Sequence, residues 1–381
     1  MNNMPDARIL VIKDLGQAAK EIAAIGAEDN KVDWLAKRTY FLTIKIEKIL
    51  AEDAIIIKND MLEIGGNAAY DKKVYTQQVK ETDMILSGTM RSYDRLVKRL
   101  KFRTKEASKV ADIIQFLITN NESNRTNLLC KDKRIPVGKK SIVMGAMDIT
   151  LNDNLKKEIE YAEKIIEEGA DIIDICCDKA KDADEIVKYI SPLVKKIESN
   201  YSIPICINTS DSDVANRLLD VGAHIINATW GVQSDKELAQ IVSSYKAGII
   251  LMHNKTNNLY KDIMGEIVAY LKRNIEMCQS AGIGISNIVI DPGIGFGKNI
   301  KQDFEIVRKL RELKSLGVPL MVGTSRKEMI GKILNLPIEE QLEGTAASIT
   351  ASILNGADIV RVHDVKQMKQ VAMIADAIAK K

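Results

Sequence analysis

The feature that most constrains this chain is a set of short apolar runs that recur from residue 141 to its end. Each run is rich in Ile and Val and is followed by a stretch with helical periodicity. The runs are 141–149, 170–176, 203–208, 223–227, 247–253, 287–291, 318–323 and 357–363. Continuous apolar strands of this length are typical of a parallel sheet covered on both faces. Eight such strands alternating with helices over about 240 residues predict a (β/α)8 barrel, also called a TIM barrel, which is an α/β fold.

Stretches with helical spacing separate the apolar runs, and two of them end at glycine. Residues 153–169 end at Gly169, and residues 303–317 end at Gly317. Glycine often ends helices because it takes the left-handed conformation of a C-terminal cap without steric cost. The spacing therefore predicts helices over both stretches.

The first 125 residues follow a different pattern and predict a smaller α/β domain. We expect strands over 7–14 and 82–88 and helices over 15–26, 49–66 and 90–102. The polar stretch at 120–127 is the expected linker, because clusters of Asn, Ser and Thr between periodic segments mark loops. The predicted domains are therefore 1–125, the small N-terminal α/β domain, and 126–381, the barrel.

Composition excludes several classes of protein. Lys and Arg number 55 and Asp and Glu 52, a net charge of +3, so no charge bias points to nucleic acid or a membrane surface. The apolar runs are far shorter than the roughly 18 residues of a membrane span, and the N-terminus carries no secretory pattern. The 5 cysteines lack C-x-x-C spacing, which argues against disulfides or structural zinc. We expect a cytoplasmic protein that binds neither nucleic acid nor membrane.

Polar residues follow nearly every predicted barrel strand. In such barrels the active site lies at the C-terminal ends of the strands, so these residues are candidates before any family is considered. A buried Asp or Asn is costly unless it is paired, and a bound ligand would supply the pairing. The candidates are Asp148, Asp174, Asn208, Asn227, His253, Asp291, Ser325–Lys327 and Arg361–His363.

The most specific segment is IDPGIGFGKN at 290–299. Its glycines allow the backbone to turn sharply and to approach a ligand closely. Asp291 would point into the barrel mouth, where a carboxylate accepts two hydrogen bonds from a flat N–H/NH2 edge, as on a pterin or guanine ring. The alternative is a tight loop in which Asp291 caps a helix. The segment is not a P-loop, because the Gly-Lys-Ser/Thr ending is missing.

Cationic residues follow the seventh predicted strand. Ser325 would cap a helix whose first turn carries Arg326 and Lys327. A helix N-terminus with two cations suits an anion or a polar ring. The alternative is a solvated basic helix start.

The eighth strand adds Arg361 and His363, which share one strand face because they are two residues apart. Together they suit a phosphate or pyrophosphate, and the phosphate site of such barrels usually lies near the last two strands. The alternative is a surface pair of Arg361 with Asp364 beside a packed histidine.

Other residues near the strands have a simpler interpretation or an open one. His253 is either a ligand contact or a satisfied core histidine, and the sequence does not choose between them. We interpret Cys176 and Cys177 as small apolar residues at a strand end, because no electropositive partner is visible. His224 and Trp230 are expected to pack rather than to take part in chemistry.

Four motifs, in this order and spacing, resemble dihydropteroate synthase. They are DPGIGFGKN, GTSRKEMIG, GTAAS and RVHDV, which begin at residues 291, 323, 344 and 361. VMGAMDIT resembles the family's first-strand motif M-G-I-L-N-V-T, and GAHIINATWG resembles its G-A-x-I-I-N-D-V-S-G. The similarity covers 136–381, and the small domain is similar to an N-terminal extension of some bacterial members.

The resemblance implies a transferase of folate biosynthesis that joins 6-hydroxymethyl-dihydropterin pyrophosphate to p-aminobenzoate and releases pyrophosphate. It implies a pterin site formed by Asn208, Asn227, Asp291 and Lys327, although the family has Asp at the position of Asn208. It also implies a homodimer formed through outer barrel helices.

The resemblance further implies a pyrophosphate clamp and a metal. The clamp comprises Arg361 and His363, flanked by Ser325 and Arg326, and the catalytic residues are Lys327, Arg361 and His363. Asp148 stands where the family has the Asn that helps hold Mg²⁺, and a carboxylate is also a ligand of Mg²⁺.

Two loops depart from the family's pattern. After the first strand the chain reads TLNDN where the family has T-P-D-S-F, and after the second it reads CCDKAK where the family has G-G-E-S-T-R-P. The altered loops, 151–155 and 177–184, correspond to those that form the p-aminobenzoate pocket. Two alternatives therefore stay open: a pterin-binding enzyme with another acceptor, such as a methyl-folate methyltransferase, and a catalytically silent pterin binder.

Overall fold

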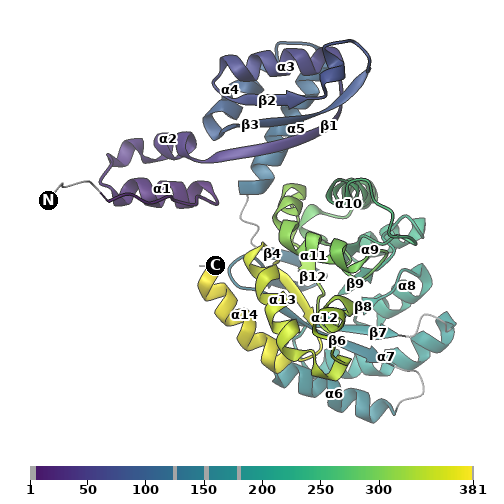
Figure 1. The fold of residues 1–381 in the computed structure, drawn as a ribbon. Helices are drawn as coiled ribbons and strands as arrows, with labels where there is room; N and C mark the ends of the chain where they lie inside the picture. Colours follow the sequence, from purple (N-terminus) through teal and green to yellow (C-terminus); the bar gives the residue numbers. More distant parts are fainter. Residues whose placement is uncertain (1–5, 123–126, 150–153, 178–181, 380–381) are drawn as a thin grey trace. The chain divides into compact units, whose positions relative to one another are not determined.

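The computed structural model describes residues 6–122, 127–149, 154–177 and 182–379. The chain divides into two compact units, residues 1–123 and 124–381 (Figure 1). Part of the expected linker at 120–127 lies outside the described residues. Its start belongs to helix α5 (Lys105–Glu122), and Asn127 begins strand β4 (Asn127–Cys130).

The second unit is built on one sheet of eight parallel strands. All eight predicted runs form strands, so the predicted α/β barrel is confirmed. The sheet order is β11-β10-β9-β8-β7-β6-β13-β12, and a bridge between Ile290 and Leu320 joins its two outer strands. The strands are β6 (Ile142–Ile149), β7 (Ile172–Cys177), β8 (Ile205–Asn208), β9 (Ile225–Ala228), β10 (Gly248–Met252), β11 (Ile288–Asp291), β12 (Met321–Val322) and β13 (Ile359–Val362).

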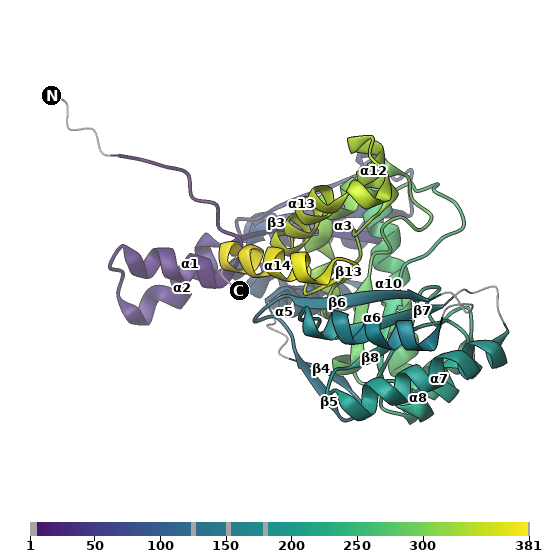
Figure 2. The same cartoon turned by 90° about the horizontal axis from the view of Figure 1, so that it is seen from below.

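Helices surround this sheet (Figures 1 and 2). They are α6 (Leu155–Glu167), α7 (Ala183–Asn200), α8 (Ser212–Val221), α9 (Lys236–Ser244), α10 (Ile263–Ser280), α11 (Ile300–Lys309), α12 (Glu328–Leu334), α13 (Leu342–Leu354) and α14 (Val365–Ala379). Gly169 and Gly317 follow helical segments with φ of 97° and 70°, as their spacing predicts. The helix expected over 303–317 begins earlier, at Ile300, because Asn299 forms a capping box, and its second half is the 3-10 helix Leu310–Leu316.

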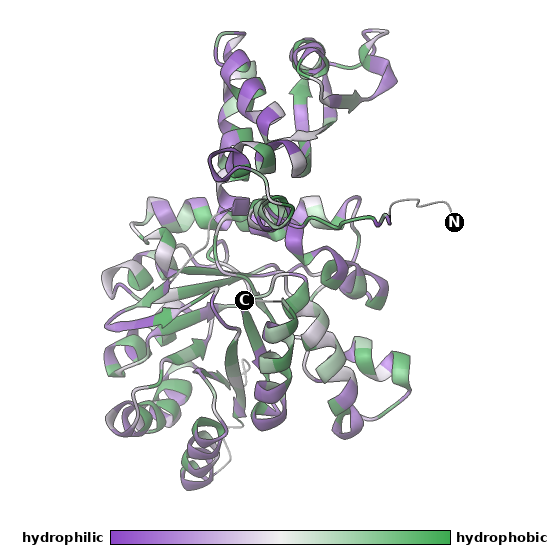
Figure 3. Ribbon diagram, turned by 90° about the vertical axis from the view of Figure 1, so that its left-hand side faces the viewer, coloured by the Kyte–Doolittle hydropathy of each residue, from purple (hydrophilic) through white to green (hydrophobic). Residues whose placement is uncertain are grey.

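The strands bury apolar side chains on both faces. Much of the strand ribbon carries the hydrophobic colour in Figure 3. Met144, Cys206, Ile250 and other side chains fill the interior of the barrel. A hairpin of β4 and β5 (Lys133–Pro136) contributes to the same cluster and lies at the N-terminal ends of the strands, where Lys131 N donates to Lys246 O. The hairpin is not among the predicted elements. Because the interior is filled from this end, a ligand can approach only from the opposite end.

The first unit contains a three-stranded antiparallel sheet in the order β1-β3-β2. The predicted strand at 82–88 and the three predicted helices are confirmed in their central parts. The elements are α1 (Leu15–Ala24), α2 (Asp29–Thr39), β1 (Phe41–Leu50), α3 (Ala51–Glu63), β2 (Asn67–Tyr70), β3 (Glu81–Thr89), α4 (Met90–Leu100) and α5.

This unit differs from expectation in several features, and α2, β2 and α5 were not predicted. The predicted strand at 7–14 is wrong: residues 6–13 have no regular structure, and Ile9 is 94% exposed. Apolar residues alone do not make a strand without a neighbour to pair with, and β1 and β3 pair with each other. Strand β1 was not predicted, because an irregularity between Ile46 and Ile49, with Lys48 at φ 56°, interrupts its alternation. No helix among the described residues is long and apolar enough to span a bilayer.

We expect Gly145→Ala to destabilise the barrel. An added Cβ would lie 2.4 Å from Ile165 Cγ2 and 3.1 Å from Val365 Cγ2, so α6 or α14 has to move away from β6. Overpacking of this kind lowers the free energy of unfolding by about 1–3 kcal/mol. Urea unfolding followed by Trp230 fluorescence measures the change in a Trp34→Phe background, which leaves one of the 2 tryptophans.

The matched control is Gly284→Ala, where an added Cβ meets only the end of the Asn287 side chain, at 3.1 Å. A Gly145→Ala protein that unfolds at the same urea concentration as the control would contradict the close packing of β6.

Candidate active site

Strand register brings the predicted site residues to one end of the barrel. Asp148 pairs with Cys176, Cys176 with Asn208, and Asn208 with Asn227. Each lies two or four residues beyond a side chain that fills the barrel interior. Since side chains alternate along a strand, all four point inward. Four neighbouring strands therefore contribute one row of side chains to the mouth of the barrel.

An ion pair between Arg361 and Asp174 lies at the centre of this mouth. Arg361 Nε donates to Asp174 Oδ2 over 2.6 Å, and the Asp174 side chain is fully buried. Burial disfavours the charged guanidinium, but attraction to Asp174 and then to Asp148 outweighs it and raises the pKa of Arg361. The guanidinium is therefore a permanent positive charge inside the barrel. It is not paired with Asp364, as the alternative interpretation required.

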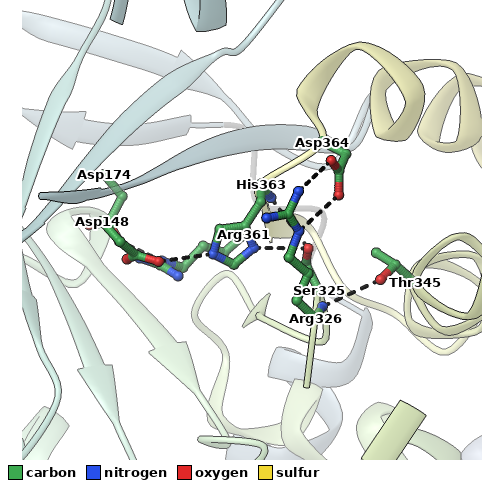
Figure 4. Close-up of polar contacts among 8 residues, drawn as sticks. All are labelled: Asp148, Asp174, Ser325, Arg326, Thr345, Arg361, His363 and Asp364. Atoms are coloured by element: carbon green, nitrogen blue, oxygen red, sulfur yellow. Dashed lines mark hydrogen bonds and ion pairs between the residues drawn. The ribbon is translucent and has the colours of Figure 1, made fainter. Parts of the chain in front are cut away.

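A chain of hydrogen bonds runs from Asp148 through His363 to Ser325 (Figure 4). Asp148 Oδ2 lies 3.1 Å from His363 Nε2, and Ser325 Oγ lies 3.1 Å from His363 Nδ1. The hydrogen bond from His363, and the charge of Arg361, lower the pKa of Asp148. Ser325 is buried and also accepts from the backbone N–H of His363 at 3.3 Å. Ser325 therefore orients the imidazole, and its burial makes it unsuited to act as a nucleophile.

The prediction that a helix begins at Ser325 is wrong. Helix α12 begins at Glu328 and has 7 residues, and Lys327 is its N-cap residue. Arg326 has a positive φ of 55°, which cannot continue a helix. Its guanidinium binds the Asp364 carboxylate at 2.7 and 3.3 Å (Figure 4). The positions of the two cations, Arg326 and Lys327, therefore depend on the loop conformation and on side-chain pairs, and no helix dipole contributes at Ser325.

Asp291 lies at the end of β11, buried beside cations. Its Oδ1 accepts from Gly293 N at 2.8 Å, so the carboxylate supports the turn but caps no helix, because α11 is capped by Asn299. Burial raises the pKa of Asp291, and the positive charges of Lys327 and Lys298 oppose that effect. The carboxylate is therefore buried at the end of β11 and close to positive charges.

Three buried side-chain oxygens in this mouth have no hydrogen-bond partner within the described parts of the chain. They are Asp174 Oδ1, Asn208 Oδ1 and Asn227 Oδ1. A buried acceptor left unsatisfied costs about 1–3 kcal/mol, so three on neighbouring strands are unfavourable without a ligand. Asn227 Nδ2 donates weakly to Asp174 Oδ2 at 3.5 Å, which orients the amide oxygen. The cluster suits a flat ligand that presents several N–H groups.

Lys327 and Phe296 meet at the edge of the mouth. Lys327 Nζ lies 4.1 Å from the centre of the Phe296 ring. Burial lowers the pKa of Lys327, while Asp291 favours its charged form. Phe296 was within the glycine-rich segment but was not predicted as a site residue, although a lone aromatic between glycines is a signal that was available.

The remaining candidates lie deeper or farther away. His253 is buried, its Nδ1 lies 3.0 Å from Lys298 Nζ, and burial lowers its pKa to about 3, so it is a core histidine. His224 is buried as predicted, and burial lowers its pKa to about 4. Trp230 is not packed as expected but is 41% exposed. Cys176 points into the mouth, and the side chain of Cys177 lies outside the described residues.

A cavity of about 870 Å³ opens beside Asn208, over the ends of β7, β8 and β9. Its lining includes Thr209, Asp211, Trp230 and Ile190. It does not include Asp291, Lys327 or Arg361, so this cavity lies beside the charged centre rather than over it. The unpaired oxygens and the ion pair, not the size of the hollow, identify the site.

We expect Asp174→Ala to destabilise the barrel strongly, because it leaves the buried guanidinium of Arg361 without its main partner. Loss of one member of a buried ion pair lowers the free energy of unfolding by about 3–5 kcal/mol. Urea unfolding provides the measurement. The double variant Asp174→Ala, Arg361→Met removes both charges and should recover part of the loss, and a single variant as stable as the wild type would refute the central pair.

Comparisons with known proteins agree with this geometry. The family described as pterin binding enzyme matches residues 146–363, more than half of the chain. The dihydropteroate synthase of Clostridium beijerinckii is 36% identical over 264 residues, which are 65% of this chain and 98% of that protein. That of Bacillus subtilis is 34% identical over 265 residues, covering 66% and 93%.

Solved structures agree as well. A Clostridium difficile dihydropteroate synthase, crystallised in the presence of pteroic acid, superposes with a TM-score of 0.63 at 39% identity and covers 65% of this chain and 100% of its own. The Thermus thermophilus enzyme in complex with 6HMPPP gives 0.61 at 26%, covering 66% and 99%. The chain therefore belongs to the pterin binding enzyme family, among the dihydropteroate synthases, which are transferases.

Proposed function

We propose that the protein joins 6-hydroxymethyl-dihydropterin pyrophosphate to p-aminobenzoate and releases pyrophosphate. The observation that carries this proposal is the cluster of unpaired oxygens of Asp174, Asn208 and Asn227, set beside Asp291 and the cation of Arg361. A pterin presents N–H and NH2 donors along its edge, and its pyrophosphate needs positive charge. One substrate therefore satisfies both halves of the mouth.

We place the pterin ring on the side of the mouth that carries hydrogen-bond acceptors. Asn208 and Asn227 have oxygens available for ring N–H groups, and Asp291 supplies a buried carboxylate for a paired N–H/NH2 edge. Lys327 closes the ring site, because its ammonium lies 4.1 Å from the centre of the Phe296 ring and the Asp291 carboxylate favours its charged form. These four polar residues are the pterin contacts that the family resemblance implies.

The pyrophosphate is assigned to Arg361 and His363. Arg361 is charged at any ordinary pH, and His363 is held in place by Ser325 and Asp148. Arg326 flanks them, but its guanidinium is bound to Asp364, so its proposed part is to fix the loop. Ser325 likewise acts through His363 rather than on the substrate directly.

Magnesium fits the donor set only in combination with substrate. The Asp148 side chain lies beside Arg361 and is 62% exposed, so its carboxylate is accessible to an ion. Among the described residues, no group of three His, Cys, Asp or Glu side chains could hold a metal alone. Mg²⁺ commonly takes one or two carboxylates, and water and substrate phosphates complete its shell. Asp148 would hold it, and the ion would neutralise charge on the departing pyrophosphate.

The residues of this chain act by position and charge. The C–O bond between the pterin methylene and the pyrophosphate breaks, and Arg361 and His363 stabilise the negative charge that develops on the leaving group. Asn227 and Asp291 hold the ring so that the cationic methylene faces the amine, which forms the new C–N bond and loses a proton to water. No covalent enzyme intermediate is required, in agreement with the burial of Ser325.

The half of the site that corresponds to the p-aminobenzoate pocket differs from the family's motif. Cys176 points into the mouth where the motif has glycine, and most of the loops 151–155 and 177–184 lie outside the described residues. The prediction that this half is rewritten therefore stays a prediction. We take p-aminobenzoate as the acceptor on the strength of the related enzymes.

A homodimer and a cytoplasmic location also stay predictions. Exposed apolar side chains on α14 support a dimer through outer helices, since Met373, Ile374 and Ile378 leave an apolar surface toward solvent. An apolar surface of this kind is typical of an interface between subunits.

We expect Asp291→Ala to weaken pterin binding by about 2–4 kcal/mol, because two ring donors lose a charged acceptor in a buried site. Titration calorimetry with the pterin pyrophosphate measures the loss. Asp220→Ala, at an exposed position on α8, is the control and should bind as the wild type does. Equal affinity in the two variants would place the pocket elsewhere.

Turnover tests the reaction itself. We expect pyrophosphate release from the pterin pyrophosphate and p-aminobenzoate, and its loss when EDTA removes Mg²⁺. Asp148→Ala should lower the affinity for Mg²⁺ at least about 10–100-fold, while Asp148→Asn, which restores the residue of the family motif, keeps an oxygen ligand and loses less. Tight pterin binding without product would exclude the synthase and favour another acceptor or a silent binder.

A further inference from the structure

The loop after β11, residues 293–298, is held by hydrogen bonds from several elements. We call it the glycine-rich loop. Asp303 Oδ1, on α11, accepts from Gly295 N at 2.8 Å, and Tyr260 OH donates to Gly297 O at 2.8 Å. Phe296 lies between these two anchors, and its ring faces the Lys327 ammonium. The position of the ring therefore depends on how firmly the loop backbone is held.

Lys298 makes the central contacts of this loop. Its Nζ donates to Phe296 O at 2.7 Å and to His253 O at 3.2 Å, and it lies 3.0 Å from His253 Nδ1. His253 is neutral at ordinary pH, because burial lowers its pKa to about 3, so its ring nitrogen accepts. An ammonium has three N–H donors, and all three find an acceptor here.

The glycine-rich loop and the chain after β10, which Lys298 joins, lie unusually close together. A Cβ on Gly293 would lie 2.0 Å from His253 O, and a Cβ on Gly297 would lie 2.0 Å from Lys255 O. Both glycines have positive φ, of 69° and 62°. The loop backbone therefore lies directly on the chain that follows β10.

Asp291 is tied to the same contact. His253 N donates to Asp291 O at 2.9 Å, and Gly293 N donates to Asp291 Oδ1 at 2.8 Å. The segment bound by Lys298 therefore also sets the orientation of the Asp291 carboxylate.

We propose that Lys298 is a positioning residue of this enzyme. Its ammonium hydrogen-bonds the glycine-rich loop to the chain after β10 and thereby positions Phe296 and Asp291 relative to the substrates. This inference rests on the proposed function. Lys298 touches no substrate itself. Its side chain is partly buried beneath the loop, where its contacts are with protein acceptors.

The charged groups around Lys298 come from three elements: Asp291 from β11, Asp303 from α11, and Lys327 before α12. Burial is the main effect and lowers the pKa of Lys298 to about 8, against the attraction of the two carboxylates. Below pH 8 the ammonium donates three hydrogen bonds, and above it the neutral amine donates two. The fastening weakens as the pH rises through about 8, so activity falls over that range.

The test compares Lys298→Met with Lys301→Met, an exposed lysine three residues away on α11. We expect Lys298→Met to lower kcat/KM about 10–100-fold, because small displacements of positioning groups cost that much, and to abolish the loss of activity near pH 8. Lys298→Gln keeps an N–H donor and should be intermediate. Hydrogen–deuterium exchange of peptide 293–298, without substrate, should be about tenfold faster in Lys298→Met, since an opened loop exchanges faster.

The outcomes separate this inference from the proposed function. Unchanged exchange, or unchanged kcat/KM and pH profile in Lys298→Met, overturns the inference even when the wild type turns over. If the wild type gives no product, the proposed reaction fails, and the exchange measurement decides alone: faster exchange supports the fastening role and unchanged exchange refutes it.

Discussion

The rest of the site depends on one buried charge pair. Arg361 and Asp174 meet at 2.6 Å between β13 and β7, which flank β6 in the sheet, and Asp148 on β6 lies 3.6 Å from the same guanidinium. A guanidinium at this depth is tolerated only with such partners. Because one oxygen of Asp174 is engaged, its other oxygen is left for a ligand. The pair thus divides the mouth into a cationic side and a side of hydrogen-bond acceptors.

That division explains why a bipartite substrate fits. On the side of hydrogen-bond acceptors, the oxygens of Asn208 and Asn227 have no partner in the described parts of the chain, and a ligand rich in N–H groups supplies one. The cationic side holds the Arg361 guanidinium, with His363 beside it, and a pyrophosphate compensates the charge of the guanidinium. Lys327 lies between the two sides, where burial destabilises its charge and a bound anion would stabilise it. The ring would satisfy the buried hydrogen-bond acceptors, and the pyrophosphate would compensate the buried positive charge, both of which are unfavourable in the protein without substrate.

The sequence predicts the barrel well because parallel buried strands are continuous apolar runs. It also predicts which residues reach the mouth, since strand ends and alternation fix direction. It does not predict partners. Ser325 binds His363 instead of capping a helix, Arg326 binds Asp364, and Lys298 binds carbonyl groups of two loops, because these pairings join segments distant in sequence or depend on loop conformation. The failed strand at 7–14 has the same cause: apolar character shows what prefers burial, not what it pairs with.

Two departures from the family's motif become intelligible together. The motif has Asn at the position of Asp148 and Asp at the position of Asn208, and here the two are exchanged. The register places them in one row, separated only by Cys176 on β7. The exchange keeps the total charge of the mouth but moves a carboxylate from the pterin side to the cationic side, beside Arg361 and His363. An amide oxygen still accepts from a ring N–H, and a carboxylate at 148 is a stronger ligand for Mg²⁺ than an amide. The proposed pterin contact at Asn208 therefore keeps an oxygen acceptor, while the proposed magnesium ligand at position 148 becomes a carboxylate.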